Sequence, residues 1–336
     1  MSTSQRVLSI QSHVTYGYVG GKAAVFPLQC LGYDVDVVNT VNFSNHSGYG
    51  RFGGTRTSAS ELRQILQTME ENQFPDPSRL LTGYIPGPEA LSVVQELASK
   101  LRKRHPELVY LLDPVMGDSG ALYVSPSVVC IYKSMLRLAT VITPNWFEVE
   151  TLTSVRIEDP QSLRDAIGIL HEEYQVPNVV VSSIPMKPWL AKFLPDDIPK
   201  DQPTDLLCIS SSRGNPGKNS VVHACTVPLI PGYFSGVGDL FSALILAHFD
   251  PDGKSPLPDA VGKALSKTHD IIRLTNAHAQ TLDEADRTTT DDELDRKDPM
   301  RLVRRMRGRE LRLIQGQDII RGEGSSREMK VWEKFW

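Results

Sequence analysis

A glycine-rich stretch with one aspartate, Gly236-Val237-Gly238-Asp239, directly precedes the strongly apolar segment Leu240–Phe249. Glycines let the backbone turn tightly and approach a ligand, and the apolar segment predicts a buried helix. A glycine-rich loop that opens a helix offers unpaired N–H groups and the positive end of the helix dipole to an anion. An aspartate there could take a proton from a hydroxyl that attacks a bound phosphoryl group. The same spacing also fits Asp239 as a simple N-cap of a core helix.

Polar and acidic residues follow several other β-rich segments. Ligands of an open parallel sheet bind beyond the carboxyl ends of its strands, so we expect these residues to share one crevice with Asp239. They are Ser12 and His13 after the first predicted strand, Thr82–Tyr84 after the third, Asp113–Asp118 after the fourth, Thr143–Asn145 after the fifth and Ser182–Ser183 after the sixth. His13 and His46 could each be a general base, but neither is assigned, because hydrogen-bonded loop histidines are commoner.

Asp113, Asp118 and Glu148 are candidate acids on the Mg²⁺ side of this crevice, because Mg²⁺ prefers a few carboxylates together with substrate phosphates. Structural alternatives stay open for all three. Asp113 could accept a hydrogen bond within its own loop, and Asp118 could form an Asx turn. Glu148 lies three residues after Asn145, a spacing that also predicts a capping box.

Two common phosphate-binding motifs do not occur in the sequence. A Walker A loop needs G-x-x-x-x-G-K-[ST], but Gly21-Lys22 is followed by Ala23, and Tyr16 stands where the first glycine belongs. The segment 17–21 does not fit G-x-G-x-x-G either, which disfavours a dinucleotide-binding fold. Any phosphate cradle must therefore come from the loop at 236–239.

Short β-rich segments alternate with helical ones, which predicts an α/β fold with a mainly parallel central sheet flanked by helices. The predicted strands are Arg6–Gln11, Asp34–Val38, Arg79–Thr82, Leu108–Asp113, Val141–Thr143 and Asn178–Ser182, with an antiparallel hairpin of Asp205–Ile209 and Val221–Thr226 at one edge. The predicted helices are Gly20–Leu31, Ser58–Asn72, Pro88–Arg104, Ser127–Leu138, Asn145–Ser154, Ser162–Tyr174, Leu240–Phe249 and Asp259–Thr281. No repeat or interdomain linker stands out, so residues 1–336 are interpreted as a single domain.

Two segments depart from this pattern and are interpreted as surface insertions, at 185–204 and 283–310. The first holds five prolines between Pro185 and Pro203, which predicts an irregular surface loop. In the second, 283–298 carries eight acidic and three basic residues, and 301–312 carries six arginines and one glutamate. Such charge segregation predicts a solvated, mobile stretch, with phosphate or partner binding as the alternative for the arginines.

Composition limits the partners and the compartment. The net charge of −4 and the charged fraction of 23% predict no dominant basic face, so nucleic acid is not an expected partner. The N-terminal segment lacks the apolar run of a signal peptide, and no apolar run reaches the roughly 20 residues that span a bilayer. The four widely spaced cysteines form no C-x-x-C pair; they are Cys30, Cys130, Cys208 and Cys225. We therefore expect reduced thiols, no membrane partner and a cytoplasmic location, with the nucleus as a further compartment.

Seven blocks of the chain resemble the pyridoxal kinases of the ribokinase-like family of small-molecule kinases. The blocks are Val7–His13, Gly17–Gly20, Val41–Tyr49, Leu81–Tyr84, Asp113–Asp118, Ile142–Asn145 and Gly236–Phe241. Many ribokinase-like enzymes share the blocks at Asp113 and Gly236, whereas Val7–His13 and the Asn-Phe-Ser-Asn-His run are far more particular to pyridoxal kinases. The resemblance covers the chain except the two unusual segments, and it implies a ribokinase-like three-layer sandwich.

The resemblance implies ATP-dependent phosphorylation of the hydroxymethyl group of pyridoxal, pyridoxine or pyridoxamine in vitamin B6 salvage. It implies Asp239 as the base, with the N–H groups of Gly236, Val237 and Gly238 around the transferred phosphoryl group. The implied vitamer contacts are Ser12, Val19, Phe43, Ser47 and Tyr84. The implied ATP contacts are Asp113, Asn145, Ser182, Ser183, Gly236 and Val237, and Asp118, Thr143 and Glu148 are implied around Mg²⁺ and a monovalent cation, K⁺ or Na⁺. The resemblance also implies a homodimer.

Two positions depart from the family pattern. Val237 stands where the family usually has threonine, so the backbone donor stays and a side-chain hydroxyl is lost. Ser47 also replaces a usual threonine but keeps the hydroxyl. Two other functions stay open: another ribokinase-like kinase, such as a hydroxymethylpyrimidine kinase, and a catalytically silent protein that binds a B6 vitamer or nucleotide.

Overall fold

The structure is a computed structural model that describes residues 5–74, 76–118, 120–199, 204–214, 218–287, 292–322, 324 and 326–336. Within these residues, one sheet of ten strands crosses the molecule. In sheet order its strands are β12 (Lys330–Val331), β11 (Val221–Val227), β10 (Leu206–Ser212), β9 (Asn178–Pro185), β8 (Val141–Ile142), β5 (Val109–Leu112), β4 (Arg79–Thr82), β1 (Arg6–Val14), β2 (Asp34–Phe43) and β3 (Gly54–Arg56). A separate ribbon pairs β6 (Gly117–Asp118) with β7 (Ala121–Leu122).

The central strands of the sheet are parallel, from β2 through β1, β4, β5 and β8 to β9. The chain builds outward from β1 in both directions, so the switch in strand order lies between β1 and β4, where open α/β sheets bind ligands. β10 and β11 pair antiparallel near one edge, and the short β12 lies outside them. The predicted parallel sheet and the predicted hairpin are both confirmed.

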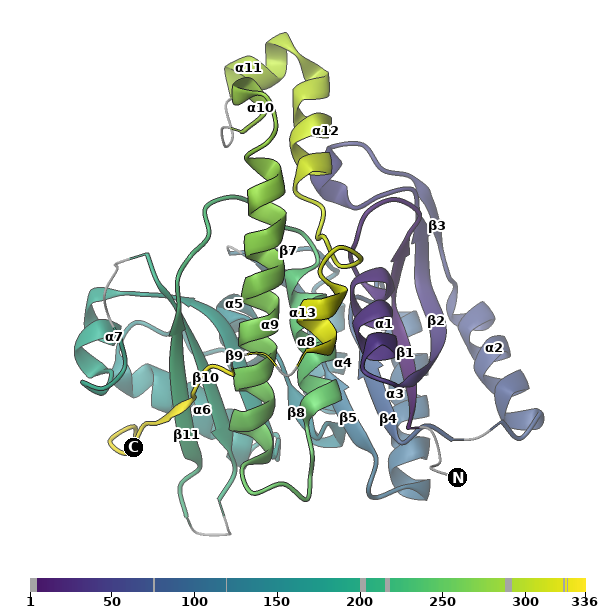
Figure 1. The fold of residues 1–336 in the computed structure, drawn as a ribbon. Coiled ribbons are helices and arrows are strands. Elements are labelled where there is room, and N and C mark those ends of the chain that lie inside the picture. Colours follow the sequence, from purple (N-terminus) through teal and green to yellow (C-terminus); the bar gives the residue numbers. More distant parts are fainter. Residues whose placement is uncertain are drawn as a thin grey trace.

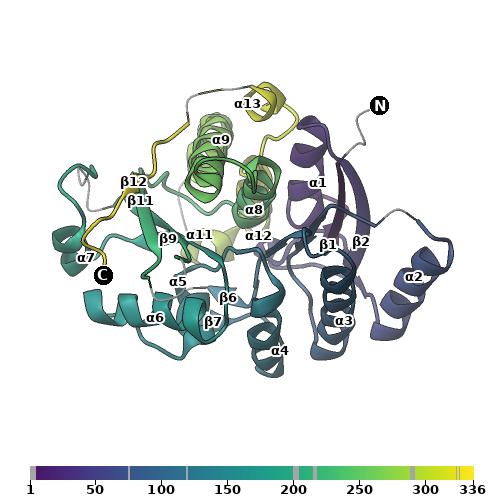
Figure 2. The ribbon, with the colours of Figure 1, turned by 90° about the horizontal axis from the view of Figure 1, so that it is seen from below.

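Helices cover both faces of the sheet and give the molecule three layers (Figure 1). Figure 2 shows one face covered by α1 (Gly21–Cys30), α8 (Val237–His248), α9 (Pro256–Ala279) and α13 (Gln317–Arg321). The opposite face carries α2 (Ala59–Glu71), α3 (Pro88–Arg104), α4 (Ser127–Met135), α5 (Trp146–Thr153) and α6 (Pro160–Glu172). Short 3₁₀ turns lie at η1 (Ser47–Tyr49) and η2 (Leu136–Leu138). The predicted α/β fold is confirmed.

Each face of the sheet packs against its own apolar core, because successive strand side chains point to opposite faces. Val7 and Leu81 pack on the α1 and α8 side, whereas Leu8 packs on the other. The helix α8 is buried along most of its length, including Leu240 and Leu244. This packing fixes its N-terminus, and with it the loop that precedes it, beside the carboxyl ends of the parallel strands. None of the described helices combines the length and apolar character that crossing a membrane would require.

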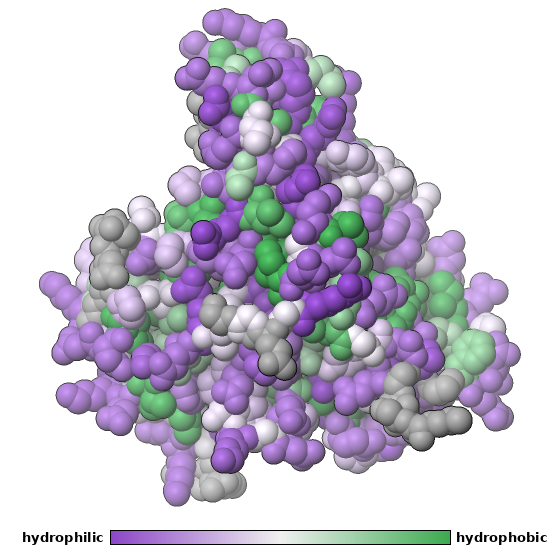
Figure 3. All heavy atoms as spheres, viewed as in Figure 1, coloured by the Kyte–Doolittle hydropathy of each residue, from purple (hydrophilic) through white to green (hydrophobic). Residues whose placement is uncertain are grey.

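The segment 283–310 forms a helical projection beyond the end of α9 (Figure 1). Its helices are α10 (Glu284–Arg287), α11 (Asp292–Lys297) and α12 (Pro299–Gly308), while residues 288–291 lie outside the described residues. The face of the projection that is visible in Figure 3 is largely hydrophilic. The prediction of a solvated charged stretch is nevertheless wrong for three of its arginines, because Arg301, Arg305 and Arg309 are buried.

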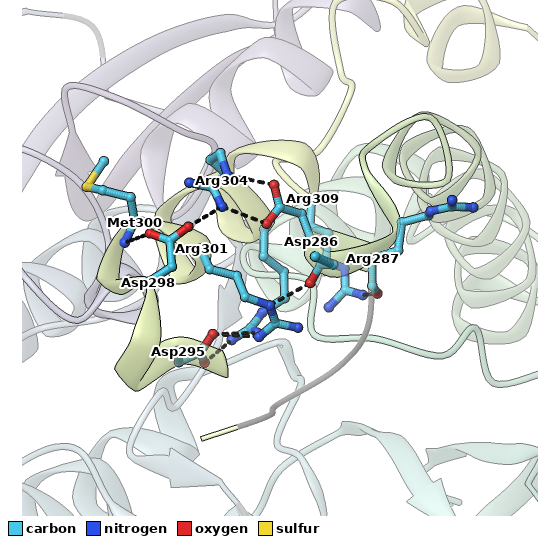
Figure 4. A network of polar contacts seen from close by, with 10 residues as sticks. Asp286, Arg287, Asp295, Asp298, Met300, Arg301, Arg304 and Arg309 are labelled. Atoms are coloured by element: carbon cyan, nitrogen blue, oxygen red, sulfur yellow. Dashed lines mark hydrogen bonds and ion pairs between the residues drawn. The ribbon is translucent and has the colours of Figure 1, made fainter. Parts of the chain in front are cut away.

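Carboxylates and a backbone carbonyl within the same projection accept hydrogen bonds from these buried arginines (Figure 4). Arg301 and Arg305 pair with Asp295, Arg304 pairs with Asp286 and Asp298, and Arg309 donates to the carbonyl of Arg287. A buried charge is tolerated when it is paired and hydrogen-bonded. The separate acidic and basic runs of the sequence therefore neutralise each other once the helices fold back on one another.

The proline-rich segment 185–204 contains regular structure, so the prediction of an irregular surface loop is wrong for its first part. Pro185 ends β9, and Pro188 begins the short helix α7 (Pro188–Phe193), where proline's missing N–H leaves no hydrogen bond unmade. Three apolar side chains of the segment are buried in the core: Leu190, Leu194 and Ile198. Residues 200–203 lie outside the described residues.

Candidate active site

The loop at 236–239 forms the start of α8, with Gly236 at the N-cap. Gly236 has φ +80°, in the left-handed region that favours glycine. A Cβ at this position would overlap the backbone carbonyl oxygen of Tyr18. Both observations require glycine here, and they bring the loop into contact with the segment that follows β1.

Asp239 is the third residue of α8, and its carboxylate accepts a hydrogen bond from the Gly20 N–H at 2.7 Å. No side chain caps this helix, so the interpretation of Asp239 as an N-cap is wrong. The hydrogen bond from Leu240 N to Gly236 O is the first backbone hydrogen bond of this helix. The N–H groups that precede Leu240 therefore lie in the first turn, where helix amides have no intrahelical acceptor and can bind an anion.

Gly20, whose N–H donates to the Asp239 carboxylate, lies close to β1. Its φ is +55°, and a Cβ would overlap the hydroxyl and carbonyl oxygens of Ser12. The close approach of Gly20 to Ser12 therefore depends on the missing side chain. Through Gly20, the segment 17–20 therefore links the end of β1 to Asp239, the candidate base.

Asp113 follows β5 and lies in a buried hydroxyl network. Ser242 in α8 donates to its Oδ2 at 2.9 Å, and the Ser242 hydroxyl also lies 2.9 Å from Thr143 Oγ1. Burial raises the pKa of Asp113 well above its usual value, and the charges of Glu148 and Asp239 raise it further. Carboxylates from three elements are therefore close enough to affect one another's ionisation.

Glu148 forms the capping box of α5 with Asn145, as the sequence alternative predicts. The Asn145 side chain accepts from Glu148 N, and Glu148 accepts from Asn145 N, both at 2.9 Å. Glu148 Oε1 also accepts from the backbone N–H groups of Met116 and Gly117. Burial raises the pKa of Glu148 to about 7, even though these N–H donors favour the ionised form. Glu148 thus caps α5 and also lies at the candidate site.

Asp239 retains partial exposure at the surface of the crevice, yet protein atoms surround its carboxylate. This burial raises its pKa above the usual value, and the hydrogen bond from Gly20 only partly opposes the shift. A carboxylate with a raised pKa is a stronger base than an ordinary aspartate. The geometry and the electrostatics therefore both suit proton abstraction.

The five predicted vitamer contacts lie on three segments, at or after the carboxyl ends of β1, β2 and β4. Ser12 is buried in β1, and Val19 is half-buried in the segment that follows it. Phe43, at the end of β2, packs against Phe52 with ring centroids 5.4 Å apart. Ser47 is exposed at the start of η1. Tyr84 is half-buried after β4, and its carbonyl accepts from Thr40 Oγ1 at 2.7 Å.

The predicted carboxyl ends of β1, β2, β9 and β10 are wrong, because each of these strands continues three to five residues further. β1 continues through Ser12 and His13 to Val14, because a bulge between Gln11 and Ser12 lets it keep its pairing with β2. Likewise Ser182 and Ser183 belong to β9 and do not follow it. Ser182 forms a parallel bridge with Asn145, and Ser183 has φ +57°, which is uncommon for a residue other than glycine.

The predicted metal residues lie on three segments, namely β6, the loop after β8 and α5. Asp118 is exposed in β6, and its charge raises the pKa of Glu148. Thr143 is buried next to Ser242. Across the part of the chain that the structure describes, no three His, Cys, Asp or Glu side chains form a ready metal cage. A magnesium ion held by one or two carboxylates and substrate phosphates needs no such cage, so the donor set fits that ion.

Sequence reasoning missed three residues that shape the site. Gly20 was included only within a family block, Ser242 only within an apolar helix, and Glu310 only within a charged run. Glu310 accepts a hydrogen bond from Tyr18 N, two residues before Gly20. A residue 292 positions away in the chain leaves no local signal for such a contact.

Comparisons with known proteins show the family of this chain. Residues 75–285 match a family model described as phosphomethylpyrimidine kinase. The pyridoxal kinase of Arabidopsis thaliana is 38% identical over 323 residues, which cover 95% of this chain and 92% of the relative. The pyridoxal kinase of Homo sapiens is 35% identical over 286 residues, which cover 82% of this chain and 86% of the relative. The chain belongs to the pyridoxal kinase family.

A solved structure shows that this pyridoxal kinase relationship extends to the fold. The pyridoxal kinase from Leishmania donovani in complex with ADP and pyridoxamine matches with a TM-score of 0.78 and 33% identity. The match covers 98% of this chain and 99% of the other. The prediction of a ribokinase-like three-layer sandwich, made from the family resemblance, is confirmed.

Proposed function

We propose that this pyridoxal kinase homologue transfers the γ-phosphoryl group of ATP to the hydroxymethyl group of pyridoxal, and also of pyridoxine and pyridoxamine. The observation that carries the proposal is Asp239, held by Gly20 in the first turn of an uncapped, buried helix. The Leishmania donovani relative that shares this fold is a kinase in complex with ADP and pyridoxamine. Membership of the same family supports the same reaction in this chain.

In the proposed mechanism, Asp239 accepts the proton of the vitamer hydroxyl as its oxygen attacks the γ-phosphorus. The N–H groups of Gly236, Val237 and Gly238 stabilise the charge on the phosphoryl oxygens. Val237 serves as well as threonine for this purpose, because its side chain packs partly against the apolar core and only its amide is needed. Most of the catalysis comes from alignment and charge stabilisation, and the base adds a factor of roughly 10²–10⁴.

Asp113, Asn145, Ser182 and Ser183 are proposed to face the ATP phosphates. The bridge between Ser182 and Asn145 supports this proposal because it brings the two neighbouring strand ends together. Asn145 is held by its bond to Gly117 O at 2.8 Å as well as by the capping box. This rigid corner is suited to positioning a nucleotide.

We propose Mg²⁺ as the divalent metal, with Asp118, Thr143 and Glu148 around it and with K⁺ or Na⁺ as a second cation. The charges of Glu148 and Asp239 both raise the pKa of buried Asp113, and this supports cation binding here because a cation relieves such repulsion. When bound, Mg²⁺ neutralises charge on the ATP phosphates. The protein groups meanwhile hold the phosphates and the hydroxyl in line.

The vitamer is proposed to lie between Ser12, Val19, Phe43, Ser47 and Tyr84. A flat pyridine ring suits a pocket with aromatic and apolar walls and a few hydroxyl groups. Half-buried Phe43 and Tyr84 offer such walls, and the Ser12 hydroxyl lies beside Gly20. A homodimer and a cytoplasmic or nuclear location are part of the same proposal, and they rest on the family resemblance.

A substrate panel tests the function. Each of pyridoxal, pyridoxine, pyridoxamine and hydroxymethylpyrimidine is incubated with the purified chain and MgATP, and the phosphorylated products are separated. We expect the three B6 vitamers to be phosphorylated with kcat/KM at least about a hundredfold above that of hydroxymethylpyrimidine. A preference for the pyrimidine would favour the second candidate, which the description of the matching family model supports. Binding without product would favour a catalytically silent protein.

The pH dependence of the same reaction is expected to report the ionisation of Asp239. The base must be ionised, so kcat/KM falls as the pH decreases through its pKa. Because burial raises that pKa, the acidic limb is expected above the usual range of an aspartate. Profiles measured with pyridoxal and with pyridoxine distinguish this limb from titration of the substrate. An acidic limb at or below the ordinary aspartate range would contradict the assignment.

A further inference from the structure

Glu310 is the last residue of the 283–310 projection, and its side chain, only 10% exposed, lies against the segment that follows β1. Its Oε2 accepts from Tyr18 N at 2.8 Å. Its Oε1 accepts from the Tyr49 hydroxyl at 2.7 Å and lies 3.1 Å from His46 Nε2. One carboxylate thus joins three parts of the chain that are far apart in sequence.

The hydrogen bonds outweigh the cost of burying this charge. Burial disfavours the ionised form, but the bonds from His46, Tyr49 and Tyr18 lower the pKa of Glu310 below its usual value. Gly48 N donates to His46 Nδ1 at 3.2 Å, which leaves Nε2 as the protonated nitrogen that donates to Glu310. Glu310 therefore acts as a charged acceptor for three donors.

Two short routes connect Glu310 to the loop at 236–239. In the first, the Tyr18 carbonyl lies against Gly236, and Gly20 donates to Asp239. In the second, the Ser235 hydroxyl lies 3.3 Å from His46 Nδ1, directly before Gly236. Both sides of the candidate catalytic loop consequently depend on groups that Glu310 contacts.

The segment 15–20 borders open space on one side, although the Tyr18 side chain also packs against the apolar core on the α8 face of the sheet. Tyr16 and Tyr18 line a cavity of about 550 Å³ together with Glu310 and residues from the ends of α9 and α12. Tyr16 is half exposed. Because open space lies on this side, the hydrogen bond from Tyr18 N to Glu310 restrains the backbone where the cavity offers no packing.

The projection gives Glu310 a fixed anchor. Arg309 beside it is buried and donates to the carbonyl of Arg287 at 3.0 Å. Arg301 and Arg305 hold α12 to Asp295 of α11 (Figure 4). Paired buried charges of this kind hold one arrangement, because any shift would leave a charge unpaired.

We propose that Glu310 is a positioning residue for phosphoryl transfer, through which the 283–310 projection holds the vitamer-side segment 17–20 against Asp239. The proposal rests on the proposed kinase function. Glu310 itself touches no reacting atom in this account. It acts through Tyr18 N and His46, and so it sets where Val19 and Gly20 lie.

The steady-state test compares Glu310→Ala and Glu310→Gln with a matched control, Glu333→Gln, at an exposed position of the C-terminal segment. Loss of charge-assisted bonds in Glu310→Ala is expected to raise the KM for pyridoxal roughly tenfold and to lower kcat, with the KM for ATP within about twofold of wild type. Glu310→Gln keeps an acceptor for Tyr18 N and is expected to recover part of the loss. Glu333→Gln is expected to behave as wild type. A lower kcat with both KM values unchanged would show mere loss of folded enzyme and would overturn the proposal.

Hydrogen–deuterium exchange of the enzyme without substrates gives a readout that does not depend on activity. Glu310→Ala is expected to accelerate exchange of the amides at 16–20 and 46–49 and to leave the central strands unchanged. Unchanged exchange at 16–20 would overturn the positioning role, even if the wild type phosphorylates pyridoxal. Accelerated exchange with an inactive wild type would instead count against the kinase function and leave Glu310's structural effect established.

Discussion

Replacing Asp239 with asparagine is expected to lower kcat by roughly 10²–10⁴-fold, the contribution of a well-placed general base. Asparagine has nearly the same shape, and its carbonyl oxygen can still accept from Gly20 N, so α8 and the segment 17–20 stay in place. The N–H groups at 236–238 are unchanged, and we therefore expect ATP affinity within about twofold of wild type. Rates of phosphorylated product formation and calorimetric ATP binding measure the two effects separately.

The matched control for this substitution is Asp252→Asn, at an exposed position in the turn between α8 and α9. It makes the same chemical change without touching the crevice, so kcat and ATP binding are expected at wild-type values. A kcat near wild type in Asp239→Asn would show that another group removes the proton. Loss of ATP binding in that variant would show that Asp239 is needed to assemble the nucleotide site.

Replacing Gly236 with alanine is expected to lower kcat/KM by about a hundredfold or more, comparable to the loss of an oxyanion-hole donor. A side chain at φ +80° is strained by roughly 1–2 kcal/mol, and its Cβ would overlap the Tyr18 carbonyl. Tyr18 cannot retreat freely, because its N–H is bonded to Glu310. The loop must therefore move, and its amides no longer meet the phosphoryl oxygens.

Gly168→Ala provides the control for this second substitution. Gly168 lies within α6, and a Cβ there would meet no atom within 4 Å. Alanine is also the better helix former, so stability is expected to be equal or slightly higher, with unchanged kinetics. Wild-type kinetics in Gly236→Ala would contradict the requirement for a glycine at the start of α8. Urea unfolding of both variants shows whether any loss of activity arises from loss of the fold.

Local sequence signals were sufficient for the sheet, most helices and the central loop. The apolar segment after Asp239 predicted a buried helix, and the structure buries it. The Asn145–Glu148 spacing predicted a capping box, and both of its hydrogen bonds are present. In each case a residue's nearest chain neighbours determine the structure, so a pattern of a few residues carries the information.

The errors arose where distant contacts decide the outcome. The end of β1 depends on its pairing with β2 beyond a bulge, which no alternation pattern reveals. The burial of Arg301 and Arg305 depends on α11 and α12 folding together around Asp295. The contact between Glu310 and Tyr18 spans almost the whole chain. These features can be recognised only from the tertiary structure. The sequence contains Glu310, but it carries no local signal that Glu310 contacts Tyr18.

The most direct test of the central claim is identification of the product formed from pyridoxal and MgATP by the wild-type chain. The account predicts pyridoxal 5′-phosphate and ADP in equal amounts, with formation of both strongly reduced in Asp239→Asn. Mass spectrometry of the reaction identifies the phosphorylated vitamer directly. Two results would contradict the claim that the loop at 236–239 supports phosphoryl transfer to a B6 hydroxyl. One is formation of ADP without phosphorylated pyridoxal, and the other is no product in the presence of Mg²⁺ with either K⁺ or Na⁺.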